Sequence, residues 1–300
     1  MKQIHFNFLL VLFFWISNSA FSVQIVTTLP YLKNITQNIT CFDSSIKIIS
    51  LILPNSDPHN YQLTPQDRIT LEHADLIIQN GIGLEPYLDK IKLKNKVDVS
   101  QNLDLIYLKI NSNTNLKNKN ISSADPHIWQ SPVLMQKIVA NVTKEIVKFD
   151  EKNKKKYLEC SNKYSNKIKL VYKNLKTKVT KLSATEKTIV TNHDALAYFA
   201  KDFGFEIRPL MGLSDDEMPT QKDLENLIQF IKTQKIKLIY LETSGQNKMM
   251  ETVAKNANVA LGKKIYGDNL GETQEPAGTL IGMWEENVRR ILESNGKSYF

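Results

Sequence analysis

The sequence is poor in the residues that mark several common functions. Only four of its 39 basic residues are arginines, and the lysines alternate with asparagine, as in 152–156 and 163–169. Nucleic-acid-binding surfaces normally group arginine with aromatic residues on one face. The net charge of +8 therefore indicates a solvated lysine surface rather than a nucleic-acid partner. The His-Glu-x-x-His helix typical of a zinc hydrolase is also missing.

Cysteine is scarce, with Cys41 and Cys160 as its two occurrences. A disulfide between them would close a long loop and stabilise the fold by about 4 kcal/mol. A sequence does not supply the geometry that a disulfide requires. A bridge and two buried thiols therefore both stay open.

Long apolar runs are scarce as well. The unbroken run Phe8 to Ile16 follows the basic Lys2 and precedes small and polar residues. This is the pattern of a cleaved signal peptide, and the run is too short to span a bilayer. We expect residues 1–22 to be removed, with cleavage before Val23 or after Ala20. Because no cysteine lies near the cleavage point, we expect a soluble periplasmic protein without a lipid anchor, and we expect it to be a monomer.

Strand and helix patterns alternate along the rest of the chain. The predicted strands are 23–28, 46–53, 75–79, 96–99, 188–191, 205–209, 238–241 and 264–266. The predicted helices are 30–39, 64–72, 132–149, 151–182, one ending at 203, 224–233, 245–257 and 279–293, while 111–123 is expected to be a loop. Such alternation predicts an α/β fold with parallel sheets flanked by helices. We expect two similar domains, 23–150 and 183–300, joined by one long stiff helix, 151–182.

Five histidines occur, and three of them share a context. His5 belongs to the signal peptide, and His73 ends the helix 64–72, where a solvated or capping role is expected. His59, His127 and His193 each stand where the chain turns toward a helix, and ligands of open α/β sheets bind at such turns.

Two of these histidines repeat the tripeptide Asp-Pro-His, at 57–59 and 125–127. The proline stiffens each turn. The aspartate two positions before the histidine is suited to accept the ring N–H that is not used for coordination. Asp194, which follows His193, is suited to the same role or to capping its helix. The pattern favours a metal site, although single histidines are more often structural.

A tetrahedral site needs a fourth ligand. Asp268, after the last predicted strand, is the first candidate, and Glu242 is the second. Three neutral imidazoles and one carboxylate leave a dication site with a net charge of about +1. This ligand set suits Zn²⁺, whereas manganese or calcium prefers more oxygen ligands.

These motifs, taken in order, resemble a known family. The segments are Pro54 to Tyr61, Ala74 to Glu85, Asp125 to Trp129, Thr191 to Ala195 with Tyr198-Phe199, and Asp268 to Gly271. Together they are similar to the zinc/manganese solute-binding proteins of ABC transporters, the cluster A-I or zinc-uptake family. The resemblance implies a metal site between two α/β domains, with His59 and His127 from the first and His193 and Asp268 from the second.

The resemblance also implies a function, which is to capture Zn²⁺ and deliver it to a membrane permease. Members with glutamate at the third ligand position lean toward manganese or iron and those with histidine toward zinc, so a Mn²⁺ or Fe²⁺ receptor is the alternative. Two family features are missing. The loop 111–123 lacks histidine and acid, and Cys41 and Cys160 cannot form a disulfide within the second domain.

Two other functions compete with transport. In a zinc hydrolase, Glu85 or Glu217 would have to act as the general base, but both are better explained as structural, capping or surface residues. In an adhesin-like protein the metal would serve stability alone. We therefore expect a transport protein and not an enzyme.

Overall fold

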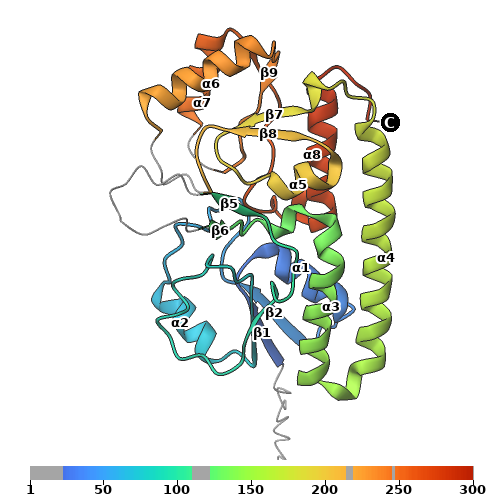
Figure 1. The fold of residues 1–300 in the computed structure, drawn as a ribbon. Helices are drawn as coiled ribbons and strands as arrows, with labels where there is room; N and C mark the ends of the chain where they lie inside the picture. The colour runs from blue at the N-terminus through green and yellow to red at the C-terminus, as the bar shows by residue number, and fades with distance from the viewer. Residues whose placement is uncertain (1–22, 110–121, 214–218, 245–246, 300) are drawn as a thin grey trace, which may run out of the picture.

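The computed structural model describes residues 23–109, 122–213, 219–244 and 247–299. The predicted signal peptide 1–22, Glu217 and residues 111–121 of the predicted loop lie outside these residues. Figure 1 shows two α/β parts stacked end to end, with one long helix alongside both. We call residues 23–150 the first half and residues 183–299 the second half.

The first half is built on a parallel sheet with the strand order β2-β1-β3-β4. Its strands are β1 Val23–Thr27, β2 Ile46–Ser50, β3 Leu76–Gln79 and β4 Lys96–Asp98. Its helices are α1 Pro30–Ile39, α2 Pro65–Glu72 and α3 Pro132–Phe149. Successive side chains of a strand point to opposite faces of the sheet. Ile25 and Val26 are both buried but belong to different hydrophobic clusters, so both faces of the sheet are covered.

A short antiparallel pair that the sequence did not predict lies between the halves (Figure 1). It consists of β5 Tyr107–Lys109 and β6 Ser122–Ala124. The strand β6 lies within the predicted loop 111–123 and consists of small polar residues, which give no alternating pattern. It ends directly before Asp125, and the 3-10 turn η1 Ile128–Gln130 follows.

The second half has two parallel pairs, β7 Thr188–Thr191 with β8 Glu206–Pro209 and β9 Leu238–Ile239 with β10 Ala260–Leu261. The Tyr240 N–H donates to the Val190 carbonyl (2.9 Å), which connects the two pairs. The helices are α5 Ala197–Phe203, α6 Gln221–Thr233, α7 Lys248–Ala257 and α8 Leu280–Ser294. Two 3-10 turns, η3 Thr185–Lys187 and η4 Pro276–Gly278, precede β7 and α8.

The predicted strand 264–266 is wrong. In this stretch Ile265 forms a single parallel bridge with Glu242, and the strand lies earlier, at β10. The cause is the side chain of Asn287 in α8. It accepts from the Tyr266 N–H (2.8 Å) and donates to the Tyr266 carbonyl (2.8 Å), so both backbone groups bond a side chain instead of a neighbouring strand.

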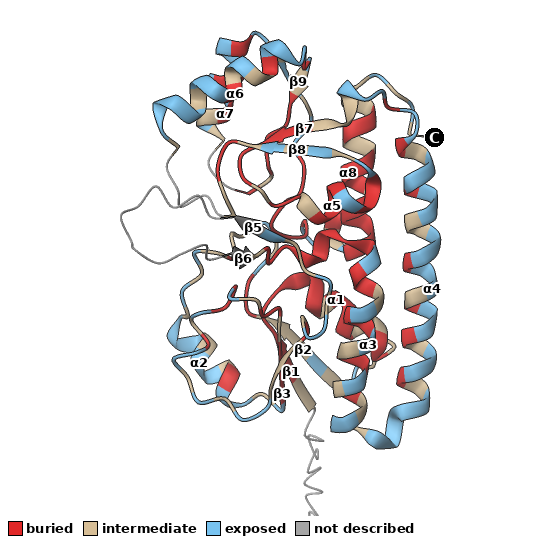
Figure 2. Cartoon of the chain, viewed as in Figure 1, coloured by how far each residue is buried: buried red, intermediate tan, exposed pale blue. Residues whose placement is uncertain are grey.

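The long helix α4 Lys154–Val179 is shorter than the predicted 151–182, because its first residues form the 3-10 turn η2 Glu151–Asn153. It packs against α1 and α3 of the first half and against α5 and α8 of the second. Its buried side chains form a stripe along one side, and its outer side is exposed (Figure 2). Tyr164 of this stripe donates to Asn34 (3.1 Å), and Tyr172 donates to the Asp202 carbonyl (2.9 Å). One helix therefore holds both halves through buried contacts.

A disulfide joins Cys41, just after α1, to Cys160 in α4. It fastens the long helix to the first half. Within the described ranges, none of the helices combines the length and apolar composition needed to cross a bilayer.

Replacing Cys41 and Cys160 by serine should lower the free energy of unfolding by about 4 kcal/mol, because the disulfide closes a loop with a sequence separation of 119. Guanidinium denaturation of the double variant and the wild type measures the difference. A reducing agent should destabilise the wild type to the same extent and leave the variant unchanged. Equal denaturation midpoints for the two oxidised proteins would contradict this prediction.

Candidate metal centre

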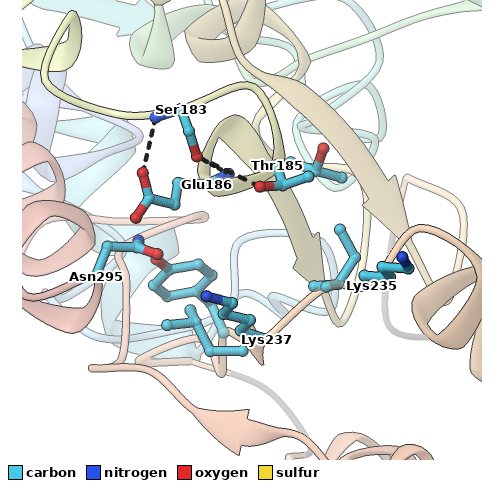
Figure 3. Close-up of a pocket in the computed structure, with 10 residues that line it drawn as sticks. Ser183, Thr185, Glu186, Lys235, Lys237 and Asn295 are labelled. Atoms are coloured by element: carbon cyan, nitrogen blue, oxygen red, sulfur yellow. Dashed lines mark hydrogen bonds between the residues drawn. The ribbon is translucent and has the colours of Figure 1, made fainter.

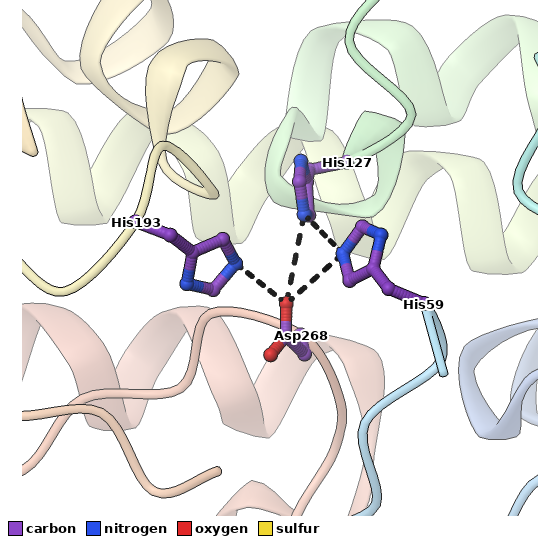
Figure 4. A group of neighbouring side chains, drawn as sticks. All are labelled: His59, His127, His193 and Asp268. Atoms are coloured by element: carbon purple, nitrogen blue, oxygen red, sulfur yellow. Dashed lines mark hydrogen bonds and ion pairs between the residues drawn. The ribbon is translucent and has the colours of Figure 1, made fainter. Parts of the chain in front are cut away.

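Four loops converge between the halves, and each carries one of the predicted site residues (Figure 4). His59 lies between β2 and α2, His127 between β6 and η1, His193 directly after β7, and Asp268 between β10 and η4. The structure thus brings all four together from both halves, although they span more than two hundred positions of the sequence. Their role as ligands is taken up under Proposed function.

The four side chains aim one polar atom each at a common point. Oδ1 of Asp268 lies 2.9 Å from Nε2 of His193, 3.5 Å from Nε2 of His127 and 3.6 Å from Nε2 of His59. The Nε2 atoms of His59 and His127 are 3.0 Å apart, and all four atoms lie within 4.8 Å of one another. The side chain of His59 is 12% exposed, and the other three are at most 3% exposed. One edge of the cluster therefore reaches solvent, through His59.

The two Asp-Pro-His turns have the same backbone geometry but different ring contacts. In each, the aspartate Oδ1 accepts the N–H of the histidine, at 2.8 Å for His59 and 2.9 Å for His127. Asp125 Oδ1 also lies 2.7 Å from Nδ1 of His127, which is the predicted ring contact. Asp57 instead accepts from the Asn60 side chain at 3.0 Å. The aspartate therefore orients the ring in the second turn, whereas in the first it bonds only backbone and amide N–H groups.

The predicted partner of His193, Asp194, is not the residue that faces its ring. Glu242 Oε1 lies 3.1 Å from Nδ1 of His193 and accepts the His193 N–H at 3.2 Å. The helix α5 begins after Leu196 without a side-chain cap, so Asp194 does not cap it either. Glu242, the second candidate for the fourth ligand, thus lies behind a histidine ring. Its place depends on strand pairing between β7 and β9, which the sequence does not reveal.

Hydrogen bonds between the halves fix the loop of Asp268, and the sequence did not predict them. Asn269 donates to the carbonyls of Leu53 (3.0 Å) and Ser56 (3.1 Å), in the loop that carries His59. The indole of Trp129 and the amide of Gln130 both donate to the Gly267 carbonyl, at 2.9 and 2.6 Å. The loop of Asp268 is therefore bound to the loops of both first-half histidines.

Glu85 supports the site from below and does not face it. Its carboxylate accepts from Thr28 (2.7 Å) and from the N–H groups of Asn80 (2.7 Å) and Gly81 (2.9 Å). Burial raises the pKa of Glu85 to about 7. The side chain of Asn80 donates in turn to the Pro126 carbonyl (3.1 Å), next to His127. Glu85 therefore holds a turn under the His127 loop, as its structural interpretation expects.

Two other features lie apart from the cluster. His73 is exposed at the end of α2, with Nδ1 2.8 Å from the Ile69 carbonyl, in agreement with the predicted solvated or capping role. A separate hollow next to β7 is lined by residues that include Ser183, Glu186 and Lys237 (Figure 3). It shares no residue with the cluster of Figure 4.

Comparisons with known proteins decide which family carries this site. The family described as "Zinc-uptake complex component A periplasmic" (ZnuA) matches residues 25–294. The chain belongs to this family. Such proteins are the substrate-binding components of metal ABC transporters, so a divalent metal ion is the cargo and a membrane permease the partner. Members of the family transport metal and are not enzymes, which removes the hydrolase alternative.

Named relatives of this ZnuA-family chain differ in their metals. It is 28% identical to the manganese ABC transporter substrate-binding lipoprotein PsaA of Streptococcus pneumoniae, over 94% of this chain and 92% of that protein. It is 26% identical to the iron-binding protein YfeA of Yersinia pestis, over 94% of this chain and 89% of that protein. The relatives therefore agree on a metal and disagree on which one.

Solved structures give the same result. The periplasmic zinc-binding protein TroA of Treponema pallidum superposes with a TM-score of 0.80 at 25% identity, over 91% of this chain and 99% of that one. A manganese-bound periplasmic metal-binding protein of Candidatus Liberibacter asiaticus superposes with a TM-score of 0.80 at 27% identity, over 91% of this chain and 99% of that one. The α/β architecture with a long helix is confirmed.

The charges around the site of this ZnuA-family protein favour protonated imidazoles when no cation is present. Burial lowers the pKa of His127, but the carboxylates of Asp125 and Asp268 outweigh it and raise that pKa to about 9. Burial also opposes charge on His193, yet Glu242 and Asp268 raise its pKa well above the usual value. Burial opposes charge on Asp268 too, but the three imidazoles, His193 first, hold its pKa well below the usual range.

Binding of Zn²⁺ by the metal-free protein should therefore release protons. A pKa near 9 leaves His127 protonated at pH 7.5, and its Nε2 must lose that proton to coordinate. Affinity should rise from pH 6 to pH 9, and about one proton or more should leave per ion at pH 7.5. Isothermal titration in buffers of different ionisation enthalpy counts these protons. Equal affinity at pH 6 and 8.5, with no proton released, would show that these rings are not ligands.

Proposed function

We propose that this protein is the zinc receptor of an ABC importer and that His59, His127, His193 and Asp268 are the metal ligands. The observation that carries the proposal is the convergence of three imidazole Nε2 atoms and one carboxylate Oδ1 within 4.8 Å. A dication placed among them would replace the protons that the raised histidine pKa values favour. Such a set of four donors suits a tetrahedral ion.

Zinc fits this donor set better than manganese or iron does. Zn²⁺ has no geometric preference from its d electrons and binds imidazole nitrogen at about 2.0–2.1 Å in four-coordinate sites. Manganese prefers carboxylate, carbonyl and water oxygens and a higher coordination number. The proposed site offers one carboxylate and three nitrogens. The names of PsaA and YfeA keep manganese and iron as the alternative cargo.

We further propose that residues 23–150 and 183–300 are two domains and 151–182 their connection, with the ion bound between them. Supporting this, α4 packs on helices of both halves, and one hydrophobic cluster contains residues of both. Such a connection opposes a wide hinge motion, so release to the permease would depend on local movement of the ligand loops. The protein would act in the periplasm as a monomer without a lipid anchor after removal of residues 1–22.

Alanine substitution of His59, His127 or His193 tests the ligand set. Each variant should lose more than about 100-fold in zinc affinity, because a lost ligand costs at least as much as the loss of a residue that only orients one. Competition titration with a chromophoric chelator at pH 7.5 measures these affinities.

The matched control is His73→Ala, which removes a histidine outside the cluster and should leave the affinity unchanged. If His73→Ala weakens binding as much as the other three variants, the site is misassigned. In the same titration Mn²⁺ should fail to displace Zn²⁺ from the wild type. Displacement at equal concentrations would assign manganese as the cargo.

A further inference from the structure

The two oxygens of Asp268 have different partners. Oδ1 faces the three imidazoles, whereas Oδ2 accepts a hydrogen bond from Oγ of Ser244 at 3.0 Å. In Figure 4 Oδ1 points toward the three rings and the other oxygen of Asp268 points away from them. Ser244 and Asp268 are 7% and 3% exposed, so water does not compete strongly for this bond. The carboxylate is thereby held with one oxygen in the site and one outside it.

The backbone fixes Ser244 in this place. Glu242 pairs in parallel with Ile265, and the Thr243 N–H donates to the Ile265 carbonyl at 2.9 Å. Two residues further along one segment and three along the other, Ser244 and Asp268 meet. Gly267 allows the two segments to approach, since a Cβ there would lie 2.3 Å from Oε2 of Glu242.

We propose that Ser244 is a specificity-determining positioning residue that keeps Asp268 monodentate and so favours zinc over manganese. This inference rests on the proposed function. With Oδ2 bound to Ser244, the protein supplies four donor atoms, which is the number that a tetrahedral zinc site uses. With Oδ2 released, the carboxylate could turn and give a fifth donor, an oxygen. Additional oxygen donors and a higher coordination number are what manganese prefers over zinc.

The test compares Ser244→Ala, which removes the hydroxyl donor, with Ser244→Thr, which keeps it. Zn²⁺ and Mn²⁺ affinities are measured for both variants and for the wild type. The ratio of zinc to manganese affinity should fall about tenfold in Ser244→Ala, the size expected for one hydrogen bond to a charged group. Ser244→Thr should retain the ratio of the wild type. Ser50→Ala is the matched control, because it removes a partly buried hydroxyl that bonds the Ile52 carbonyl, and it should also retain the ratio.

A second readout separates coordination from stability. Co²⁺ absorbs visible light strongly in a four-coordinate site and weakly in sites of higher coordination number. The Co²⁺ band should be intense in the wild type and in Ser244→Thr and weak in Ser244→Ala. A merely structural role would weaken both metals equally and leave the band unchanged, and that result would overturn the inference. If instead the wild type binds no zinc, the proposed function itself has failed.

Discussion

The structure depends on one electrostatic constraint, which is that three imidazoles and a carboxylate from four loops must share a nearly dry volume. Without a cation, the raised pKa of His127 and the lowered pKa of Asp268 show how protons offset the crowding. Carboxylates behind the rings, Asp125 and Glu242, add negative charge on the far side of two imidazoles. The same charges that hold protons in the metal-free site would favour a dication in their place.

A rigid frame is the second requirement, because the four donor atoms belong to opposite halves. The frame has two parts that act at different distances. Far from the site, α4 packs on both halves and the disulfide fastens it to the end of α1. Close to the site, Asn269 and Gln130 join the loop of Asp268 to the two histidine turns. Motion that releases the ion must therefore break a few identifiable hydrogen bonds, and the frame itself can stay in place.

Local signals predicted much of this molecule, and long-range ones did not. The β-branched strand β1 and the helices α1 and α3 follow from composition and periodicity, and the convergence of the four site residues followed from turns after strands. Contacts that depend on distant partners were missed. The strand at 264–266 failed because Asn287, some twenty positions later, takes its hydrogen bonds. The pairing of Glu242 with His193 and of Ser244 with Asp268 needs the strand order of the second half, which no local pattern encodes.

The most direct test of the central claim is a crystal structure of the zinc-loaded protein with anomalous diffraction measured on both sides of the zinc absorption edge. The account predicts one strong anomalous peak between the two halves, about 2.0–2.2 Å from Nε2 of His59, His127 and His193 and from Oδ1 of Asp268. A peak coordinated by Glu242 or His73, or one that lacks any of the three imidazoles, would contradict it.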